Sequence, residues 1–434
     1  MLRSWTVFGL CCGVGVLALM RVQGKDTTLR FSFSPSQFDS NAIRITGPVA
    51  FSSAAGYGFE SQAVKKRGST QSTLSSKLSV LLKDGNYDVK LTFRESGIST
   101  DLTVKTENRR VMLTQKQGNT SPPEAAFTVN IRTPEIRGQD PVRINSREAG
   151  PPLLARWDPM LVLEFLGPMV SVNTVEITRN DLALTVFLAG DSTVTEQAAE
   201  PYAGWGQLLP LFFGPGTAIA NHAESGLALN SFRSQRRLEK ILSSLKPGDY
   251  VFIQFGHNDQ KEKTPGSGPF TTYRERLLGF VRDVQAQQGL PVIVTPMERR
   301  RFREGHPFTT LHEFAKAARE TAAAEKVPLI DLHAMSLQLY GALGPEASTQ
   351  AFVHYPAHTF PGQDKALEDD THHNAYGGWQ LAKCVVEGIR RSVPALAARL
   401  RPETPSYDPT RPDPPSSFRL PASPGGQPMK PAGN

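Results

Sequence analysis

Beyond residue 183 the chain alternates short apolar runs with longer stretches of helical periodicity, and this alternation limits the folds open to it. Apolar runs of this length are typical of strands buried on both faces of a parallel sheet. The expected strands are residues 185–189, 217–221, 250–255, 291–295 and 328–332. The expected helices are residues 207–213, 232–245, 273–288, 310–325 and 376–393. We therefore predict an α/β fold over residues 181–400, with a parallel sheet sandwiched by helices.

Residues 25–180 have a different pattern. Short segments of alternating apolar and polar residues recur between turn signals such as Asp84-Gly85-Asn86, without a helical period. The expected strands are residues 29–34, 78–82, 87–93, 102–106, 110–113, 127–131, 160–165 and 175–178. We predict a preceding all-β sandwich domain that ends near Asn180-Asp181 and either binds carbohydrate or packs against the next domain. Residues 401–434 are rich in Pro, Ser and Gly, which predicts an extended wrap or disorder.

The first 24 residues carry the features of a secretory signal peptide. Arg3 supplies a positive charge, residues 5–20 are apolar, and Val22-Gln23-Gly24 approximates the cleavage pattern. A membrane anchor is the alternative, but the apolar stretch is shorter than the roughly 20 residues that span a bilayer. We expect a secreted or periplasmic protein with no stable membrane association after cleavage. Cleavage would remove Cys11 and Cys12, and the remaining Cys384 could form no intramolecular disulfide.

The formal net charge of the whole chain is +7. Lys and Arg are scattered rather than clustered, so no nucleic-acid partner is expected. A basic exported protein would instead tolerate or attract a polyanion such as an acidic polysaccharide.

Polar motifs follow the expected strands, at the sheet edge where ligands bind in such folds. Gly190-Asp191-Ser192 follows the first strand, and a loop from Asn221 to Gly226 follows the second. Gly256-His257-Asn258-Asp259 follows the third strand, and Glu298 lies beyond the fourth. Ser192 is a candidate nucleophile; the N–H groups of Ser192 and Gly226 and the Asn258 amide are candidate donors to an oxyanion. Taken singly, each motif also suits an ordinary turn, loop or helix cap.

The stretch Asp369-Asp370-Thr371-His372-His373 offers a carboxylate and an imidazole at D-x-x-H spacing in two registers, Asp369 with His372 or Asp370 with His373. A serine needs a base, and a carboxylate that holds the tautomer of the imidazole improves that base. We expect a helical-turn spacing to place the carboxylate below the ring. A metal site is the rival interpretation, which the lack of a cysteine ligand and of an H-E-x-x-H pattern disfavours. Its candidate ligands are His354, His358, Asp364, Asp369, His372 and His373.

Taken in order, these motifs resemble those of the SGNH hydrolases, also called the GDSL family. A closer similarity is to rhamnogalacturonan acetylesterases, over about residues 184–395. It is carried by residues 187–195 (FLAGDSTVT), 204–207 (GWGQ), 254–259 (QFGHND) and the D-x-T-H pattern at 369–372. In that family the pattern continues to an Asn and a Gly, here Asn374 and Gly377, which selects Asp369 with His372. One departure is Leu227-Ala228 after Gly226, where the family often has Arg-Ser.

The resemblance implies a serine esterase in which Ser192 is the nucleophile, His372 the base and Asp369 its orienting acid. Ser192, Gly226 and Asn258 would form the oxyanion hole, with no metal or organic cofactor. The implied reaction removes acetyl groups from pectin, with acetylated rhamnogalacturonan as the polysaccharide substrate, through an acyl-enzyme. The alternatives are an esterase on xylan or lipid esters, or a polysaccharide-binding protein with a degenerate hydrolase domain. Trp205 either stacks on a sugar ring or is a core residue.

Overall fold

The computed structural model describes residues 28–33, 40–45, 47, 49–66, 69–93, 101–115, 124–167, 172–424 and 428–432. The predicted signal peptide, with Cys11 and Cys12, lies outside the described residues. Within them, the helices are too short or too polar to traverse a bilayer.

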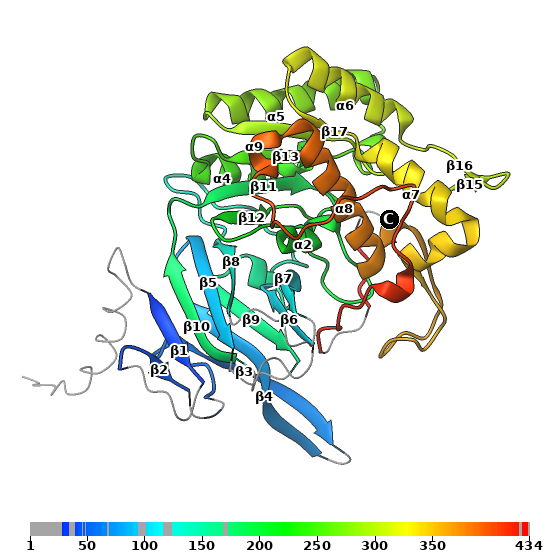
Figure 1. Cartoon of the computed structure of the whole chain (residues 1–434). Helices are drawn as coiled ribbons and strands as arrows, with labels where there is room; N and C mark the ends of the chain where they lie inside the picture. Colours follow the sequence, from blue (N-terminus) through cyan, green and yellow to red (C-terminus); the bar gives the residue numbers. More distant parts are fainter. Residues whose placement is uncertain are drawn as a thin grey trace, which may run out of the picture.

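A parallel sheet forms the centre of the C-terminal half, as predicted (Figure 1). Its five strands, in spatial order, are β17 (Leu329–Ile330), β14 (Leu290–Val294), β13 (Tyr250–Gln254), β11 (Leu184–Gly190) and β12 (Thr217–Asn221). Alternate residues of β11 face opposite sides of this sheet. Phe187 packs in one hydrophobic core with Leu238 and Phe280, whereas Leu188 packs in a second core with Trp205 and Val385. Burial on both faces explains the continuous apolar runs of these strands.

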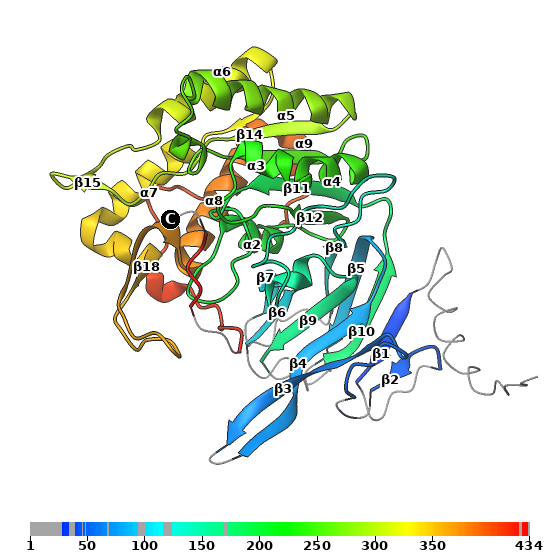
Figure 2. The same ribbon diagram turned by 180° about the vertical axis from the view of Figure 1, so that it is seen from behind.

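Helices cover both faces of the parallel sheet (Figures 1 and 2). They are α2 (Trp205–Leu208), α3 (Leu229–Ser234), α4 (Arg237–Ser244), α5 (Arg274–Ala286), α6 (His312–Glu325), α7 (Leu332–Ala347), α8 (Ala375–Ser392) and α9 (Pro394–Ala397). The helix expected at 232–245 is two helices, because Arg236 between them adopts a left-handed conformation with φ of 62°. Helix α7 was not predicted. Short β15 (Phe302–Arg303) and β16 (His306–Pro307) form a separate hairpin.

The N-terminal region is β-rich, in agreement with the sequence pattern. One set of strands is β1 (Leu29–Ser32), β2 (Ile43–Arg44), β5 (Gly85–Phe93), β8 (Glu124–Ile131) and β10 (Val172–Arg179). A five-stranded sheet contains β3 (Tyr57–Lys66), β4 (Ser69–Leu81), β9 (Met160–Leu166), β6 (Leu102–Thr106) and β7 (Arg110–Gln115). Val89 and Phe127 from the first set share a hydrophobic core with Leu78, Val104 and Leu163 from the second.

The two halves are joined through a shared sheet. Thr128 of β8 pairs in parallel with Ala218 of β12, which produces one ten-stranded sheet in the order β17-β14-β13-β11-β12-β8-β5-β10-β1-β2. The expectation of a self-contained sandwich did not include this pairing. A contact between strands about ninety residues apart leaves no local pattern in the sequence.

The C-terminal tail is an extended wrap over its described part, which is one of the two predicted alternatives. The Tyr407 hydroxyl donates to Gln380 of α8 at 2.6 Å. Further along, Lys105 of β6 donates to the Pro421 carbonyl at 2.7 Å, and Ser423 donates to Glu164 of β9 at 2.6 Å. The tail therefore contacts the N-terminal and C-terminal halves alike (Figure 1).

Candidate active site

Ser192 lies at the carboxyl edge of the parallel sheet, just beyond β11. Gly190 permits the sharp exit from the strand, because a Cβ at that position would lie 2.5 Å from Cγ2 of Val194 and 3.1 Å from the Gln254 carbonyl oxygen. The adjacent strands β12 and β13 end at Asn221 and Gln254 beside this turn. The parallel topology thus gathers the three predicted motifs at one edge.

Ser192, His372 and Asp369 form a hydrogen-bonded relay. The ring Nε2 of His372 lies 2.8 Å from Oγ of Ser192, and its Nδ1 lies 2.9 Å from Oδ2 of Asp369. All three side chains are buried. The carboxylate therefore fixes the ring so that Nε2 faces the hydroxyl, the arrangement in which an imidazole accepts a proton from serine.

The alternative register is not formed. Oδ1 of Asp370 lies 2.9 Å from Nε2 of His354 and accepts from Arg300 at 2.8 Å. The Nε2 atom of His373 instead lies 2.9 Å from the Tyr340 hydroxyl. These two residues are neighbours of the relay and take no part in it.

The acid and base lie on a bulged strand, which corrects the expected helical turn. Strand β19 (Leu367–His373) pairs with β18 (Phe352–Tyr355), and the register jumps from Val353 opposite Asp369 to Phe352 opposite His373. The extra residues loop out, and Oδ1 of Asp369 accepts from the N–H groups of Thr371 at 2.9 Å and His372 at 3.0 Å. A β-bulge is a common device for aiming a side chain at an active site.

Asp369 is held ionised by its surroundings. Burial by itself would raise the pKa of this carboxyl group. The hydrogen bonds from the His372 ring and from the two backbone N–H groups outweigh burial and lower the pKa to about 2.

Candidate oxyanion donors lie next to Ser192. In the described part of the chain, the N–H groups of Ser192 and Gly226 donate to no hydrogen-bond acceptor. Gly226 has a φ of 83°, a conformation that suits glycine. The Asn258 amide donates to the Leu227 carbonyl at 3.0 Å, which holds it against the Gly226 loop. Asn258 and Gly226 therefore lie on adjoining loops, and Gln197 connects the Gly226 loop to Ser192 by accepting from the Ser225 hydroxyl at 3.5 Å and donating to the Ser192 carbonyl at 2.5 Å.

Two buried aspartates hold the loops that carry these donors. Oδ1 of Asp191 accepts from the N–H and hydroxyl of Thr193 at 2.9 and 2.8 Å. Oδ1 of Asp259 accepts from Leu229 N–H at 3.0 Å, which ties the Asn258 loop to the start of α3. Burial raises the pKa of Asp259 to about 7, with a smaller contribution from the charge of Asp191.

Three other polar candidates have structural roles. Asn221 donates to the Val194 carbonyl at 2.9 Å, and buried Glu298 accepts several hydrogen bonds from residues 309–311. Trp205 is 1% exposed and donates to Gln254 at 2.8 Å, so it is the predicted core residue and cannot stack on a sugar. As for the metal hypothesis, no cluster of three or more His, Cys, Asp or Glu in the described ranges is arranged to hold an ion.

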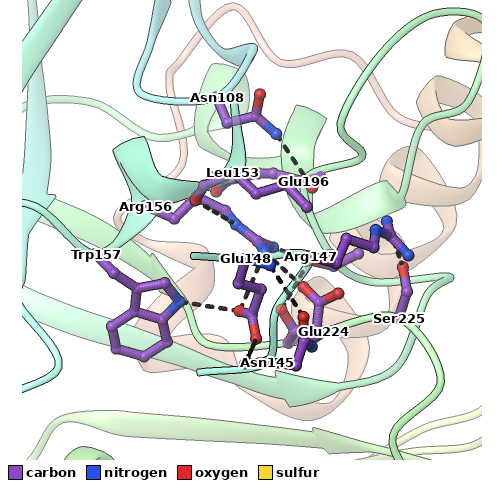
Figure 3. Close-up of polar contacts among 12 residues, drawn as sticks. Asn108, Asn145, Arg147, Glu148, Leu153, Arg156, Trp157, Glu196, Glu224 and Ser225 are labelled. Carbon is purple, nitrogen blue, oxygen red and sulfur yellow. Dashed lines mark hydrogen bonds and ion pairs between the residues drawn. The ribbon is translucent and has the colours of Figure 1, made fainter. Parts of the chain in front are cut away.

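Sequence reasoning missed a buried ionic network behind the site (Figure 3). Arg156 donates to the Thr195 hydroxyl at 2.7 Å, to Glu224 at 2.5 Å and to Glu148 at 3.2 Å. Glu148 also pairs with Arg237. The network thus links the N-terminal region to the loop after Ser192 and to the loop before Gly226. Its members are scattered along the sequence without a motif, so no sequence signal could have found them.

A buried serine at a strand end, hydrogen-bonded to an imidazole that a carboxylate orients, is the arrangement found in serine hydrolases. The chain belongs to the GDSL-like lipase/acylhydrolase family, whose model matches residues 188–377. It is accordingly a carboxylic ester hydrolase with the SGNH fold, as the sequence motifs indicated.

The chain is also similar to individual known proteins. It is 41% identical over 209 residues to rhamnogalacturonan acetylesterase RhgT of Bacillus subtilis, covering 48% of this chain and 89% of that protein. It is 26% identical over 248 residues to the rhamnogalacturonan acetylesterase of Emericella nidulans, covering 52% of this chain and 93% of the relative. A crystal structure of the B. subtilis protein YxiM matches 84% of this chain and 98% of its own, at 23% identity and a TM-score of 0.45.

Proposed function

We propose that this protein removes acetyl groups from an acetylated polysaccharide, with rhamnogalacturonan as its substrate. The relay from Asp369 through His372 to Ser192, at 2.9 and 2.8 Å, is the observation that carries the proposal. The similarity to RhgT, which extends over 89% of that acetylesterase, supports the choice of substrate.

The proposed reaction passes through an acetyl-enzyme. Oγ of Ser192 attacks the acetyl carbonyl carbon while Nε2 of His372 takes the hydroxyl proton. The N–H groups of Ser192 and Gly226 and the Asn258 amide stabilise the oxyanion. The sugar oxygen leaves with the proton held by His372, and a water molecule, deprotonated by the same ring, then releases acetate and restores Ser192.

A secreted or periplasmic location fits this proposal. A polysaccharide substrate lies outside the cell membrane, and the features of residues 1–24 suit an export signal. Immunoblotting of fractionated cells, together with N-terminal sequencing of the mature chain, tests it. An uncleaved chain in the cytoplasmic fraction would contradict the proposal.

Acetate release tests the enzymatic proposal. The wild-type protein and Ser192→Ala would be compared on acetylated rhamnogalacturonan, acetylated xylan and a small aryl acetate. We expect the highest kcat/KM of the two polymers on rhamnogalacturonan, and no release of acetate by the folded variant. A preference for xylan would contradict the proposed substrate but not the proposed mechanism. Activity retained in Ser192→Ala would overturn the mechanism.

A further inference from the structure

Arg147 is a partly buried cation that forms no ion pair among the described residues, and it lies beside the loop that carries Gly226. One guanidinium nitrogen, Nη2, is 3.5 Å from the Ser225 hydroxyl, at the limit of a hydrogen bond (Figure 3). The other two, Nε and Nη1, are enclosed, and among the described residues neither has a hydrogen-bond partner. Ser225 directly precedes Gly226. Buried N–H groups are rarely left unsatisfied, so this arginine calls for an explanation.

The backbone around Arg147 is firmly held. Glu148 N–H donates to Oδ1 of Asn145 at 2.9 Å, and Asn145 N–H donates back to Glu148 at 3.3 Å. The Glu148 carboxylate is in turn bound by Arg156, Arg237 and the Trp157 indole. This turn therefore presents the Arg147 side chain to the Gly226 loop from a fixed position, while Glu148 is committed elsewhere.

The neighbouring acid is only partly engaged. Oε2 of Glu224 accepts from Arg156 at 2.5 Å, whereas its Oε1 is buried with no hydrogen-bond partner among the described residues, and the ion pairs of the described ranges include none with Arg147. Arg147 thus differs from Arg110, Arg156 and Arg237, each of which is buried in an ion pair. Its guanidinium retains the capacity to bind an incoming anion.

A second cation flanks the oxyanion donors. Nζ of Lys261 lies 3.2 Å from Oδ1 of Asn258 and is otherwise exposed. Arg147 is therefore placed beside Gly226, and Lys261 beside Asn258. An ester positioned over Gly226 and Asn258 would have a cation near each donor, which suits a substrate that carries negative charge next to the ester.

We propose that Arg147 binds the carboxylate of a uronic acid next to the acetylated position, with Lys261 as an auxiliary cation. A guanidinium N–H forms a strong, charge-assisted hydrogen bond with a carboxylate. The esterase would then be selective for acetyl groups on acidic polysaccharides over those on neutral ones. This inference rests on the proposed function and adds the group that recognises the substrate.

The test compares one polymer in two charge states. Acetylated rhamnogalacturonan would be assayed as the free acid and after methyl esterification of its carboxyl groups. In Arg147→Gln we expect the ratio of kcat/KM between the acidic and the esterified form to fall by about tenfold to a hundredfold. Arg147→Lys should restore part of the ratio, and Lys261→Gln should lower it only severalfold. Arg143→Gln, which removes an exposed arginine from the same segment, should leave the ratio at its wild-type value.

If the ratio of kcat/KM between the acidic and the esterified polymer is unchanged in Arg147→Gln, the proposal is wrong. This includes the case in which the variant loses activity equally on both polymers. That equal loss would mean that Arg147 only positions the Gly226 loop. Melting curves of each variant exclude unfolding as its cause.

Binding gives a second readout that needs no hydrolysis. Calorimetry on Ser192→Ala with an unacetylated galacturonate–rhamnose oligosaccharide should show affinity that the Ser192→Ala/Arg147→Gln double variant loses by about tenfold or more. Equal affinity in the two proteins would overturn the assignment of Arg147, whatever the esterase activity. Arg147-dependent binding by a protein that releases no acetate would keep the assignment and overturn the proposed function.

Discussion

The His372 ring is fixed between two oxygen atoms, and its usefulness depends on which nitrogen carries the proton. Asp369 has a pKa lowered to about 2, so it remains a carboxylate that accepts from Nδ1 at neutral pH. In Asp369→Asn an amide faces Nδ1 and can present N–H to it, which favours the wrong tautomer. We expect kcat to fall by about 10⁴-fold with KM little changed, as measured by steady-state acetate release.

Asp370→Asn is the matched control for that substitution. Asp370 is adjacent in sequence, but it pairs with Arg300 and His354 away from Ser192. We expect kcat of this variant to remain within a few-fold of wild type. Equal losses in the two variants would contradict the assigned register.

Asp259 makes stability depend on pH. Burial raises its pKa from an ordinary value near 3.8 to about 7, so between these values the native state keeps a proton that the unfolded chain has lost. Stability of the wild type should therefore fall as pH rises from about 4 to 7. Asp259→Asn keeps the acceptor for Leu229 N–H and lacks the titration.

The free energy of unfolding of Asp259→Asn, relative to wild type, should consequently increase between pH 4 and pH 8, by at most about 4 kcal/mol. Denaturant unfolding of both proteins at several pH values measures it. A difference that is independent of pH would show that Asp259 does not titrate in this range.

At the scale of residues, the sequence motifs predicted the relay but not the buried arginines and their partners around it. The motifs that contain Ser192, Asn258 and His372 are short, and their order along the chain is what predicted the active site. Arg147 and Arg156 lie in no motif, and their partners Ser225 and Glu224 are 78 and 68 positions away. Only the fold brings such pairs together.

At the scale of elements, the bulge in β19 shows what spacing alone leaves undetermined. An Asp and a His three positions apart can meet on one helical turn or across a looped-out stretch of strand. The choice depends on pairing with β18, where Phe352 and Val353 set the register. The prediction of the residue pair was therefore correct, whereas that of a helical turn was wrong.

The end of the described tail lies against the oxyanion loop. A Cβ built on Gly226 would be 3.3 Å from Cβ of Ala432, so Ala432 covers one side of that glycine. Such a cover restricts a polymer more than a small ester. Deletion of residues 425–434 should raise kcat/KM on the polysaccharide severalfold relative to an aryl acetate.

The matched control for the deletion is Met429→Ser, which alters an exposed side chain in the same segment and keeps the backbone in place. We expect it to retain the wild-type ratio between the two substrates. A deletion variant with an unchanged ratio would show that the tail does not limit access.

At the scale of the whole molecule, local patterns predicted most strands but not the way in which the halves combine. Alternation of apolar residues identified β5 and β8, and buried apolar runs identified β11 and β13. The pairing of β8 with β12 and the ion pairs between the halves depend on long-range contacts. The pattern of apolar residues therefore changes near residue 180, but the hydrophobic core of the hydrolase half includes Val111 from the N-terminal region.

The N-terminal region supplies one partner of each of three buried ion pairs. Arg110 pairs with Glu196, Arg156 with Glu224, and Glu148 with Arg237, and all six side chains are nearly inaccessible to solvent. Removing residues 25–180 would leave Glu196, Glu224 and Arg237 without their ionic partners and would expose to water the surface that the N-terminal region buries. The edge of β12 would also be uncovered.

We therefore expect a chain comprising residues 181–434 to lack stable structure and esterase activity, and the whole chain to unfold in a single calorimetric transition. Arg110→Met separates the ionic contribution from the loss of sheet pairing, because it removes one charge and keeps β8 beside β12. It should lower the free energy of unfolding by about 3–5 kcal/mol. Arg30→Met, which disrupts a more exposed pair with Glu176, should lower it by about 1 kcal/mol or less. Two separate transitions, or an active 181–434 chain, would instead establish two independently folding domains. The buried ion pairs would then stabilise only the loops in which they lie.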